Sequence, residues 1–146
     1  MPPHSCASGR HHARTTSDRI RVLVVDDHPW VRALLAELVS DEEDLTVVGE
    51  CEDGSQVVDA VSRLHPDVVL MDLSMPVMNG LAATEALHAV QPEPRIVVLT
   101  GEGAAAAPKV VAAGAHALLS KSGRSDALLG CLRTVVLGCG CCPHCL

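Results

Sequence analysis

The chain of 146 residues is long enough for one domain with a single core, and two domains of ordinary size are not expected. Hydrophobic residues make up 48% of it, but Trp30 is the only aromatic residue, so it lacks the aromatic platforms on which single-stranded nucleic acids stack. The net charge of -7 disfavours contact with a phosphate backbone, and no apolar run approaches the roughly 18 residues that cross a bilayer. We therefore expect a cytoplasmic protein that binds neither nucleic acid nor membrane directly.

The two ends of the chain differ in composition from its middle. Residues 1–19 mix Pro, His, Ser, Gly and Arg without hydrophobic periodicity, which predicts a disordered arm. Residues 138–146 are rich in cysteine, and either a Zn²⁺ site or a remnant without function remains open for this tail. The folded domain is expected over residues 20–137.

Five short apolar runs within this domain are predicted to be strands. They lie at residues 20–25, 45–48, 68–71, 96–99 and 117–119. Most are apolar on both faces, and segments with helical periodicity separate them, which is typical of a parallel sheet covered on both sides. The pattern predicts a doubly wound α/β fold whose five-stranded parallel sheet has the order 2-1-3-4-5.

Helices are predicted between the strands. After the first strand, apolar residues repeat at i, i+3, i+4, i+7 and i+8 and form one stripe, made of Val31, Leu34, Leu35, Leu38 and Val39. Further helices are predicted over residues 55–64, 81–90 and 128–136. Because Pro108 would remove a hydrogen bond from a helix interior, the fourth helix should be short and begin near Ala107, after a loop or frayed turn at residues 101–106.

Polar side chains follow the predicted strands at the edge where such sheets bind ligands. Asp26 and Asp27 end the first strand and Asp72 ends the third, and the strand order reverses between these two strands. Three clustered carboxylates repel one another unless a cation intervenes, and an all-oxygen site suits Mg²⁺. Thr100 and Lys121 follow the fourth and fifth strands, so the pocket would offer a carboxylate nucleophile, a hydroxyl and an ammonium. These groups fit transfer of a phosphoryl group to an aspartate.

The same residues resemble a known family. The stretches VVDDHP at 24–29 and MDLSMPVMNG at 71–80, followed by Thr100 and Lys121, are similar to the receiver domain of two-component response regulators, particularly NarL/LuxR-type regulators. The resemblance covers residues 20–137 and implies the CheY-like, flavodoxin-like three-layer sandwich. No output domain follows in the pattern of these regulators, so direct DNA binding is not expected.

The resemblance also implies a role for individual residues. Asp72 would accept the phosphoryl group, and Asp26, Asp27, Asp72 and the backbone carbonyl of Ser74 would bind Mg²⁺. The donor would be a phosphohistidine of a sensor histidine kinase, or a small acyl phosphate. The signal would pass to an unknown downstream protein, with a homodimer left open. Only self-phosphorylation and slow autodephosphorylation are implied, so we expect that the protein is not an enzyme with a turnover substrate.

Four positions would control the phosphorylated state. Thr100 would be the switch hydroxyl and Lys121 would bind the phosphoryl oxygens, while Ser74 and Glu102 would tune the rate of dephosphorylation. Leu118 stands where related receivers carry a Tyr or Phe, so the aromatic part of the switch is missing.

Several other interpretations stay open at this point. The most serious is a degenerate receiver that acts as a phosphorylation-independent interaction module, because of Leu118 and Pro108. A small Mg²⁺-dependent phosphatase fits poorly because its two carboxylates would be spaced differently, and flavin binding fits poorly with an acidic loop. Taken alone, Asp26 and Asp27 before Pro29 could cap a helix, and His28 and His116 are read as ordinary polar or capping residues.

Overall fold

The computed structural model describes residues 19–73, 75, 78–91, 93–101, 103–121 and 124–137. Of the expected arm at residues 1–19 only Arg19 is described, and the Cys-rich tail at 138–146 lies outside the described residues. No helix in the described ranges has both the length and the apolar character needed to cross a membrane.

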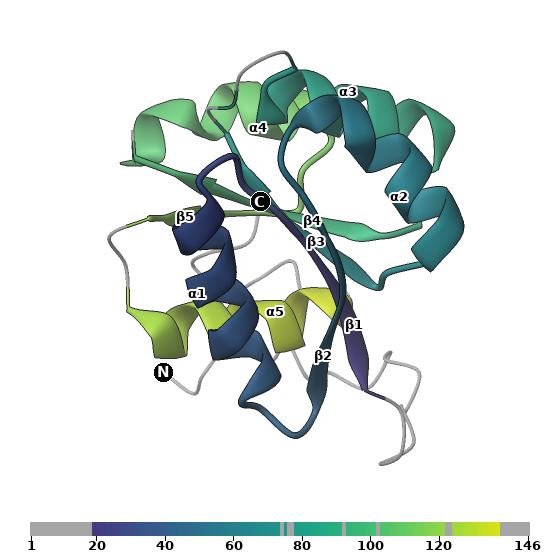
Figure 1. The fold of residues 1–146 in the computed structure, drawn as a ribbon. Helices are drawn as coiled ribbons and strands as arrows, with labels where there is room; N and C mark the ends of the chain where they lie inside the picture. The colour runs from purple at the N-terminus through teal and green to yellow at the C-terminus, as the bar shows by residue number, and fades with distance from the viewer. Residues whose placement is uncertain are drawn as a thin grey trace.

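One parallel sheet forms the centre of the described structure (Figure 1). Its strands are β1 (Ile20–Val25), β2 (Leu45–Cys51), β3 (Val68–Asp72), β4 (Arg95–Thr100) and β5 (Ala117–Ser120). They are arranged in the order β2-β1-β3-β4-β5, which confirms the predicted doubly wound fold. The strands run in the same direction, so their carboxyl ends lie at one edge of the sheet.

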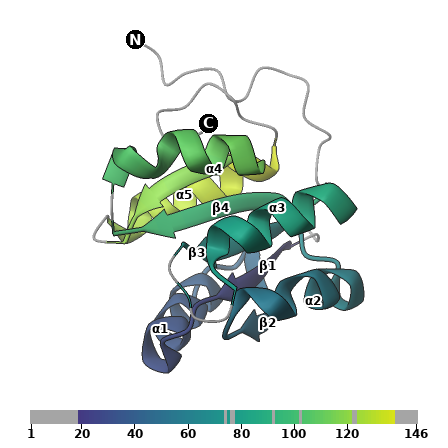
Figure 2. The same cartoon turned by 90° about the horizontal axis from the view of Figure 1, so that it is seen from above.

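Helices cover both faces of the sheet. One layer consists of α1 (Pro29–Ser40) and α5 (Ser125–Val136). The other consists of α2 (Val57–Leu64), α3 (Gly80–Val90) and α4 (Ala107–Ala113). Figure 1 shows the two layers on opposite sides of the strands, and in Figure 2 the helices α4, α3 and α2 follow one another across the sheet.

The strands bury side chains on both faces, as their apolar runs predicted. In β1, Val22 and Val24 belong to the core under α1 and α5, whereas Leu23 and Val25 belong to the core under α2, α3 and α4. All four are at most 1% exposed. This alternation buries both faces of the sheet and leaves its carboxyl edge for polar groups.

Helix α1 differs from the prediction. Only Val39 of the predicted stripe is fully buried, and Leu34 is 53% exposed, so the stripe does not face the core as a whole. Val31, Leu35 and Leu38 line a cavity of about 600 Å³ between α1 and α5. The physical reason is that α1 is apolar around most of its circumference, so its spacing does not select a single buried face.

The segment before α4 also differs from the prediction. Helix α4 begins at Ala107, as expected, and Pro108 lies in its first turn, where a missing N–H breaks no helical bond. Residues Gly103–Ala106, however, form the 3-10 helix η2 instead of a loop or frayed turn. Alanine favours helical backbone angles, and 3-10 turns are common at the N-termini of α-helices.

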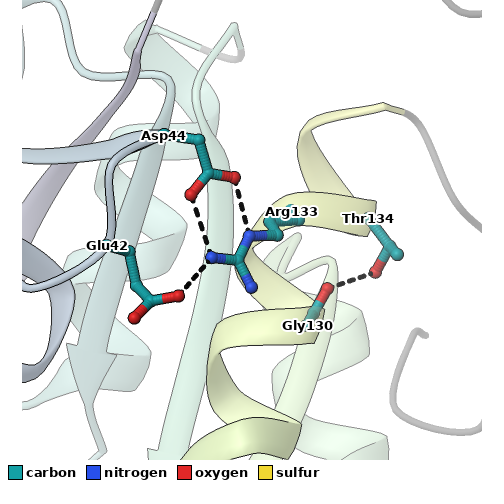
Figure 3. Close-up of polar contacts among 5 residues, drawn as sticks. All are labelled: Glu42, Asp44, Gly130, Arg133 and Thr134. Carbon is teal, nitrogen blue, oxygen red and sulfur yellow. Dashed lines mark hydrogen bonds and ion pairs between the residues drawn. The ribbon is translucent and has the colours of Figure 1, made fainter.

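An arginine clamp fastens α5 to the turn between α1 and β2 (Figure 3). Arg133 Nη2 lies 2.6 Å from Glu42 Oε1, and Arg133 Nε lies 2.7 Å from Asp44 Oδ2. The hydrogen bond from Arg133 lowers the pKa of Asp44, and the two carboxylates raise the pKa of Arg133. Thr134 turns away from the clamp, since its hydroxyl donates to the Gly130 carbonyl within α5.

Close backbone contact between β3 and α3 requires glycine at position 80. Gly80 N donates to the Leu73 carbonyl at 2.9 Å, and a β-carbon at this position would overlap the backbone oxygen of Asp72. Backbone cannot move aside as a flexible side chain can, so the first turn of α3 and the end of β3 fit together only without a side chain at Gly80.

A Gly80→Ala variant is therefore expected to lower the free energy of unfolding by about 2 kcal/mol. The matched control is Gly130→Ala in α5, where a β-carbon would meet nothing within 4 Å. Because alanine favours a helix more than glycine does, this control should raise the free energy of unfolding by about 0.5–1 kcal/mol. Urea unfolding followed by circular dichroism measures both changes, and equal stability of the two variants would contradict the packing argument.

His116 forms a specific contact between β4 and the turn before β5, contrary to the expectation of an ordinary surface histidine. Its Nδ1 accepts a hydrogen bond from Ile96 N at 3.0 Å, and its backbone N donates to the Ile96 carbonyl at 2.8 Å. Burial lowers its pKa to about 4, with smaller contributions from the charges of Arg95 and His88. The folded protein therefore holds the neutral imidazole, which can accept at Nδ1.

This geometry predicts acid-sensitive stability. The unfolded chain binds a proton at His116 near its ordinary pKa of 6.5 and the folded chain only near 4. As the pH falls from about 6.5 to about 4, the free energy of unfolding should therefore decrease, by on the order of 2 kcal/mol. His116→Asn keeps an acceptor at the same place without titrating, so this part of the decrease should vanish. Urea unfolding across this pH range tests it, and identical pH profiles for parent and variant would refute it.

Candidate functional site

The predicted polar residues meet at the carboxyl edge of the sheet. Asp26 and Asp27 follow β1, Asp72 ends β3, Thr100 ends β4 and Lys121 follows β5. Backbone hydrogen bonds continue the sheet into this edge, since Asp26 N donates to the Cys51 carbonyl at 3.1 Å and Lys121 N to the Thr100 carbonyl at 2.9 Å. The ladder thus fixes the backbone from which each functional side chain extends.

Lys121 connects the two buried carboxylates. Its Nζ lies 2.9 Å from Asp72 Oδ1 and 3.6 Å from Asp26 Oδ2. Asp26 is fully buried and Asp72 is 2% exposed, whereas the lysine side chain is 34% exposed. A charge removed from water needs a partner of opposite charge, so one ammonium compensates carboxylates from β1 and β3 that are 46 residues apart in sequence.

The acidic surroundings stabilise the charged form of Lys121. Burial by itself lowers the pKa of this lysine, but the hydrogen bond and charge of Asp72, together with Asp26, outweigh burial and raise it. The side chain is therefore an ammonium over the whole physiological range, with donors for the oxygens of an anion as well as for the carboxylates.

Hydrogen bonds fix Asp26, but one of its two carboxylate oxygens accepts none from the described residues. Its Oδ1 accepts from His28 N at 2.9 Å, while its buried Oδ2 accepts no hydrogen bond from the described residues and has Lys121 nearby. A buried carboxylate oxygen without a hydrogen bond is costly, and a hard divalent cation is the group that this oxygen fits.

Asp27 and His28 extend the acidic cluster towards solvent. One ligand atom each from Asp26, Asp27 and His28 lies within 4.8 Å of the other two, a spacing that could hold a metal ion. His28 is the N-cap residue of α1, but its side chain makes no capping hydrogen bond, and its Nδ1 lies 3.5 Å from Asp27 Oδ1. The alternative reading of Asp26 and Asp27 as helix caps therefore does not match the structure.

The remaining predicted residues divide into described and undescribed positions. Thr100 is 2% exposed at the end of β4, beside Ser120 of β5. Leu118 is partly buried and packs against the core under α2, α3 and α4. Ser74 and Glu102 lie outside the described residues, so the predicted carbonyl ligand of the metal and the two tuning positions are not placed.

Sequence reasoning missed the role of Arg32. From α1, its Nη1 donates to the backbone carbonyl of Asp26 at 2.8 Å, and its Nε lies 3.1 Å from Glu50 Oε1 on β2. The available signal was a basic residue early in the helix that follows the acidic pair. Its position in the sequence does not show that its side chain points back towards that pair.

Removal of the central ammonium is expected to destabilise the fold. Lys121→Met leaves two buried carboxylates without their shared cation, which should lower the free energy of unfolding by about 2 kcal/mol. A second change, Asp72→Asn, removes one of these charges and should restore part of the loss. The control is Lys109→Met on the exposed surface of α4, where a change below about 0.5 kcal/mol is expected. Urea unfolding in the absence of divalent cations measures these free energies of unfolding. A Lys121→Met protein as stable as the parent would contradict the bridging role.

Comparisons with known proteins agree with this fold. The family model of the response regulator receiver domain matches residues 22–133. The response regulator domain of CheB from Thermotoga maritima has a TM-score of 0.75 and 32% identity, covering 81% of this chain and 96% of that one. A LuxR-family response regulator from Aurantimonas sp. has a TM-score of 0.79 and 30% identity, covering 83% and 87%.

Curated relatives are longer than the matched region. A protein-glutamate methylesterase/protein-glutamine glutaminase from Pyrococcus abyssi is 39% identical over 112 residues, which are 75% of this chain and 30% of that protein. The transcriptional regulatory protein LiaR from Bacillus subtilis is 38% identical over 121 residues, which are 82% of this chain and 57% of LiaR. The chain thus spans less than a third of the first relative and a little over half of the second.

These relatives correct one expectation. The sequence led us to expect a protein that is not an enzyme and has no turnover substrate, but relatives from Pyrococcus abyssi and Myxococcus xanthus are named as enzymes. The receiver chemistry of the matched part does not exclude such an activity, so that expectation was wrong. The predicted resemblance is confirmed, because the family model covers most of the chain and receivers of CheB and of a LuxR-family regulator share its fold. The chain belongs to the response regulator receiver domain family.

Proposed function

We propose that this receiver accepts a phosphoryl group on Asp72 from a phosphohistidine of a sensor kinase in the cytoplasm and signals through a protein partner. The observation that carries the proposal is the ammonium of Lys121 between Asp72 and Asp26, 2.9 Å and 3.6 Å from their oxygens. A buried nucleophile beside a fixed cation, at the edge of the sheet where ligands bind, suits transfer of an anionic group.

The acidic residues support a Mg²⁺ site in this proposal. Asp26, Asp27 and Asp72 would supply carboxylate oxygens, and the backbone carbonyl of Ser74 would be a further ligand. Two observations support this site. Asp26 Oδ2 accepts no hydrogen bond from the described residues, and further ligand atoms lie close to Asp26. When bound, the cation would neutralise the carboxylates and the charge on the oxygens of the phosphoryl group.

In the proposed step the Asp72 carboxylate attacks phosphorus. A bond forms between a carboxylate oxygen and phosphorus, and the bond from phosphorus to the donor nitrogen breaks. The electron pair of the broken bond stays on that nitrogen. If the other ring nitrogen carries a proton, the imidazole leaves neutral, and if it does not, the departing nitrogen takes up one proton from water. The ammonium of Lys121 binds the oxygens of the transferring group, because its raised pKa keeps it charged.

The signal would arise from the charge that phosphorylation adds. A phosphoryl group brings a net charge of about -1.5 to -2 next to Lys121, which directly follows β5, and next to the hydroxyl of Thr100, the proposed switch. Because Leu118 replaces the aromatic residue of the switch, any rearrangement of β5 and α4 relies on Thr100 and Lys121. Ser74 and Glu102 are the proposed tuning positions for dephosphorylation.

Phosphorylation is expected to require Asp72 and Mg²⁺. With acetyl phosphate and Mg²⁺, the intact protein should gain the mass of one phosphoryl group, and chelation by EDTA should abolish the gain. Asp72→Asn should gain nothing, because an amide is a poor nucleophile, whereas the control Asp59→Asn on exposed α2 should behave as the parent does. Mass spectrometry of the intact proteins measures this.

Two outcomes would overturn parts of the proposal. Modification of Asp72→Asn to the parent level would reject Asp72 as acceptor. A protein partner that binds the unphosphorylated parent, the phosphorylated parent and Asp72→Asn with equal affinity would instead support a phosphorylation-independent interaction module, the reading that Leu118 favours.

A further inference from the structure

We propose that Arg32, held in place by Glu50, is a positioning residue for the cation site, which it controls through the backbone of Asp26. The inference rests on the proposed function, because the cation site is itself part of that proposal. It assigns a function to an ion pair between α1 and β2 that touches neither the phosphoryl acceptor nor a proposed metal ligand side chain.

Asp26 is fixed from several directions, and Arg32 supplies one of them. The Asp26 amide donates to the Cys51 carbonyl at 3.1 Å, its Oδ1 accepts from His28 N at 2.9 Å, and its carbonyl accepts from Arg32 Nη1 at 2.8 Å. Only Oδ2 accepts no hydrogen bond from the described residues, and this atom faces Lys121. The backbone contacts therefore decide where the available oxygen points.

The guanidinium is itself immobilised. Its side chain is 18% exposed, and its Nε lies 3.1 Å from Glu50 Oε1 on the neighbouring strand. The guanidinium thus contacts the loop after β1 through one nitrogen and β2 through another. Lysine has a single nitrogen and cannot reproduce this two-point contact. Arg32 N also donates to the His28 carbonyl at 2.9 Å, so the helix that carries the guanidinium starts at the loop it supports.

The loop needs such support because its side chains repel one another. Asp26 and Asp27 are adjacent carboxylates, and Asp72 approaches the same lysine. Before a cation binds, this repulsion favours spreading of the loop, which would separate the ligand oxygens. Glu50 balances the charge of Arg32, so the loop is held without an additional net positive charge that would oppose a divalent cation.

The experiment measures cation affinity directly. Trp30, four residues beyond Asp26 and the only tryptophan in the chain, is 68% exposed and reports on this loop by fluorescence. Mg²⁺ titration of Trp30 emission gives a Kd, and Mn²⁺, a paramagnetic ion that quenches nearby emission, gives a second one. Circular dichroism and urea unfolding establish that each variant is folded under the titration conditions.

Arg32→Met should raise the Kd for Mg²⁺ about tenfold, as expected for loss of a group that orients a ligand. Arg32→Lys keeps the charge but not the two-point contact, so it should resemble Arg32→Met. Glu50→Met should raise the Kd roughly threefold, because Arg32 keeps its bond to Asp26 but loses its acceptor on β2. The matched control is Arg63→Met, which breaks the exposed Arg63–Asp59 pair on α2 and should leave the Kd unchanged.

The outcomes separate this inference from the proposed function. If the parent binds neither Mg²⁺ nor Mn²⁺, both fail. If the parent binds Mg²⁺ and folded Arg32→Met and Arg32→Lys bind it equally well, only the positioning role is overturned. If Arg32→Lys matches the parent while Arg32→Met does not, charge alone acts and the two-point contact is rejected. Should the arginine variants not fold, the Kd of Glu50→Met is the test: a parent-like Kd would overturn the positioning role, and a raised Kd would support it.

Discussion

The ammonium of Lys121 between two buried carboxylates is the interaction on which the carboxyl edge of this receiver depends. Asp26 and Asp72 stand at the ends of neighbouring strands in a largely apolar sheet, where a charge removed from water needs a partner of opposite charge. A single lysine from the loop after β5 reaches both. The strand order makes this possible, since only β4 separates β3 from β5 and the long side chain of Lys121 reaches across it.

The rest of the fold keeps this edge in place from both layers of helices. On one side, Gly80 lets α3 start against the backbone of Asp72, so β3 and its following helix form one unit. On the other side, Arg133 binds Glu42 and Asp44 and fixes α5, the helix that follows the loop of Lys121, to the α1–β2 turn. The elements that carry the carboxylates and the ammonium therefore contact each other both at the site and at a distance from it.

The sequence predicts the sheet and the position of the site because both follow from local pattern. Apolar runs mark the strands, parallel topology places their carboxyl ends together, and Asp26, Asp72 and Lys121 stand directly at those ends. The exposure of Leu34 was not predictable, since α1 is apolar on nearly all sides. The partners of Arg32 and Arg133 were not predictable either, because many surface charges compete for each arginine and only the tertiary fold selects among them. For His116, the deciding fact is an acceptor contact across two strands, which residue type alone does not reveal.

The distribution of contacts at the acidic corner links cation binding to phosphorylation in the proposed mechanism. Lys121 lies closer to Asp72 than to Asp26, 2.9 Å against 3.6 Å, so one ammonium serves the two carboxylates unequally. If it turns to the oxygens of a phosphoryl group on Asp72, the buried Oδ2 of Asp26 loses its nearest cation. The Oδ1, amide and carbonyl of Asp26 stay fixed by His28, Cys51 and Arg32. An immobile carboxylate that loses one positive charge binds another more strongly. Because the Asp26 backbone is rigid, movement of Lys121 towards the phosphoryl group would raise the affinity of Asp26 Oδ2 for a divalent cation.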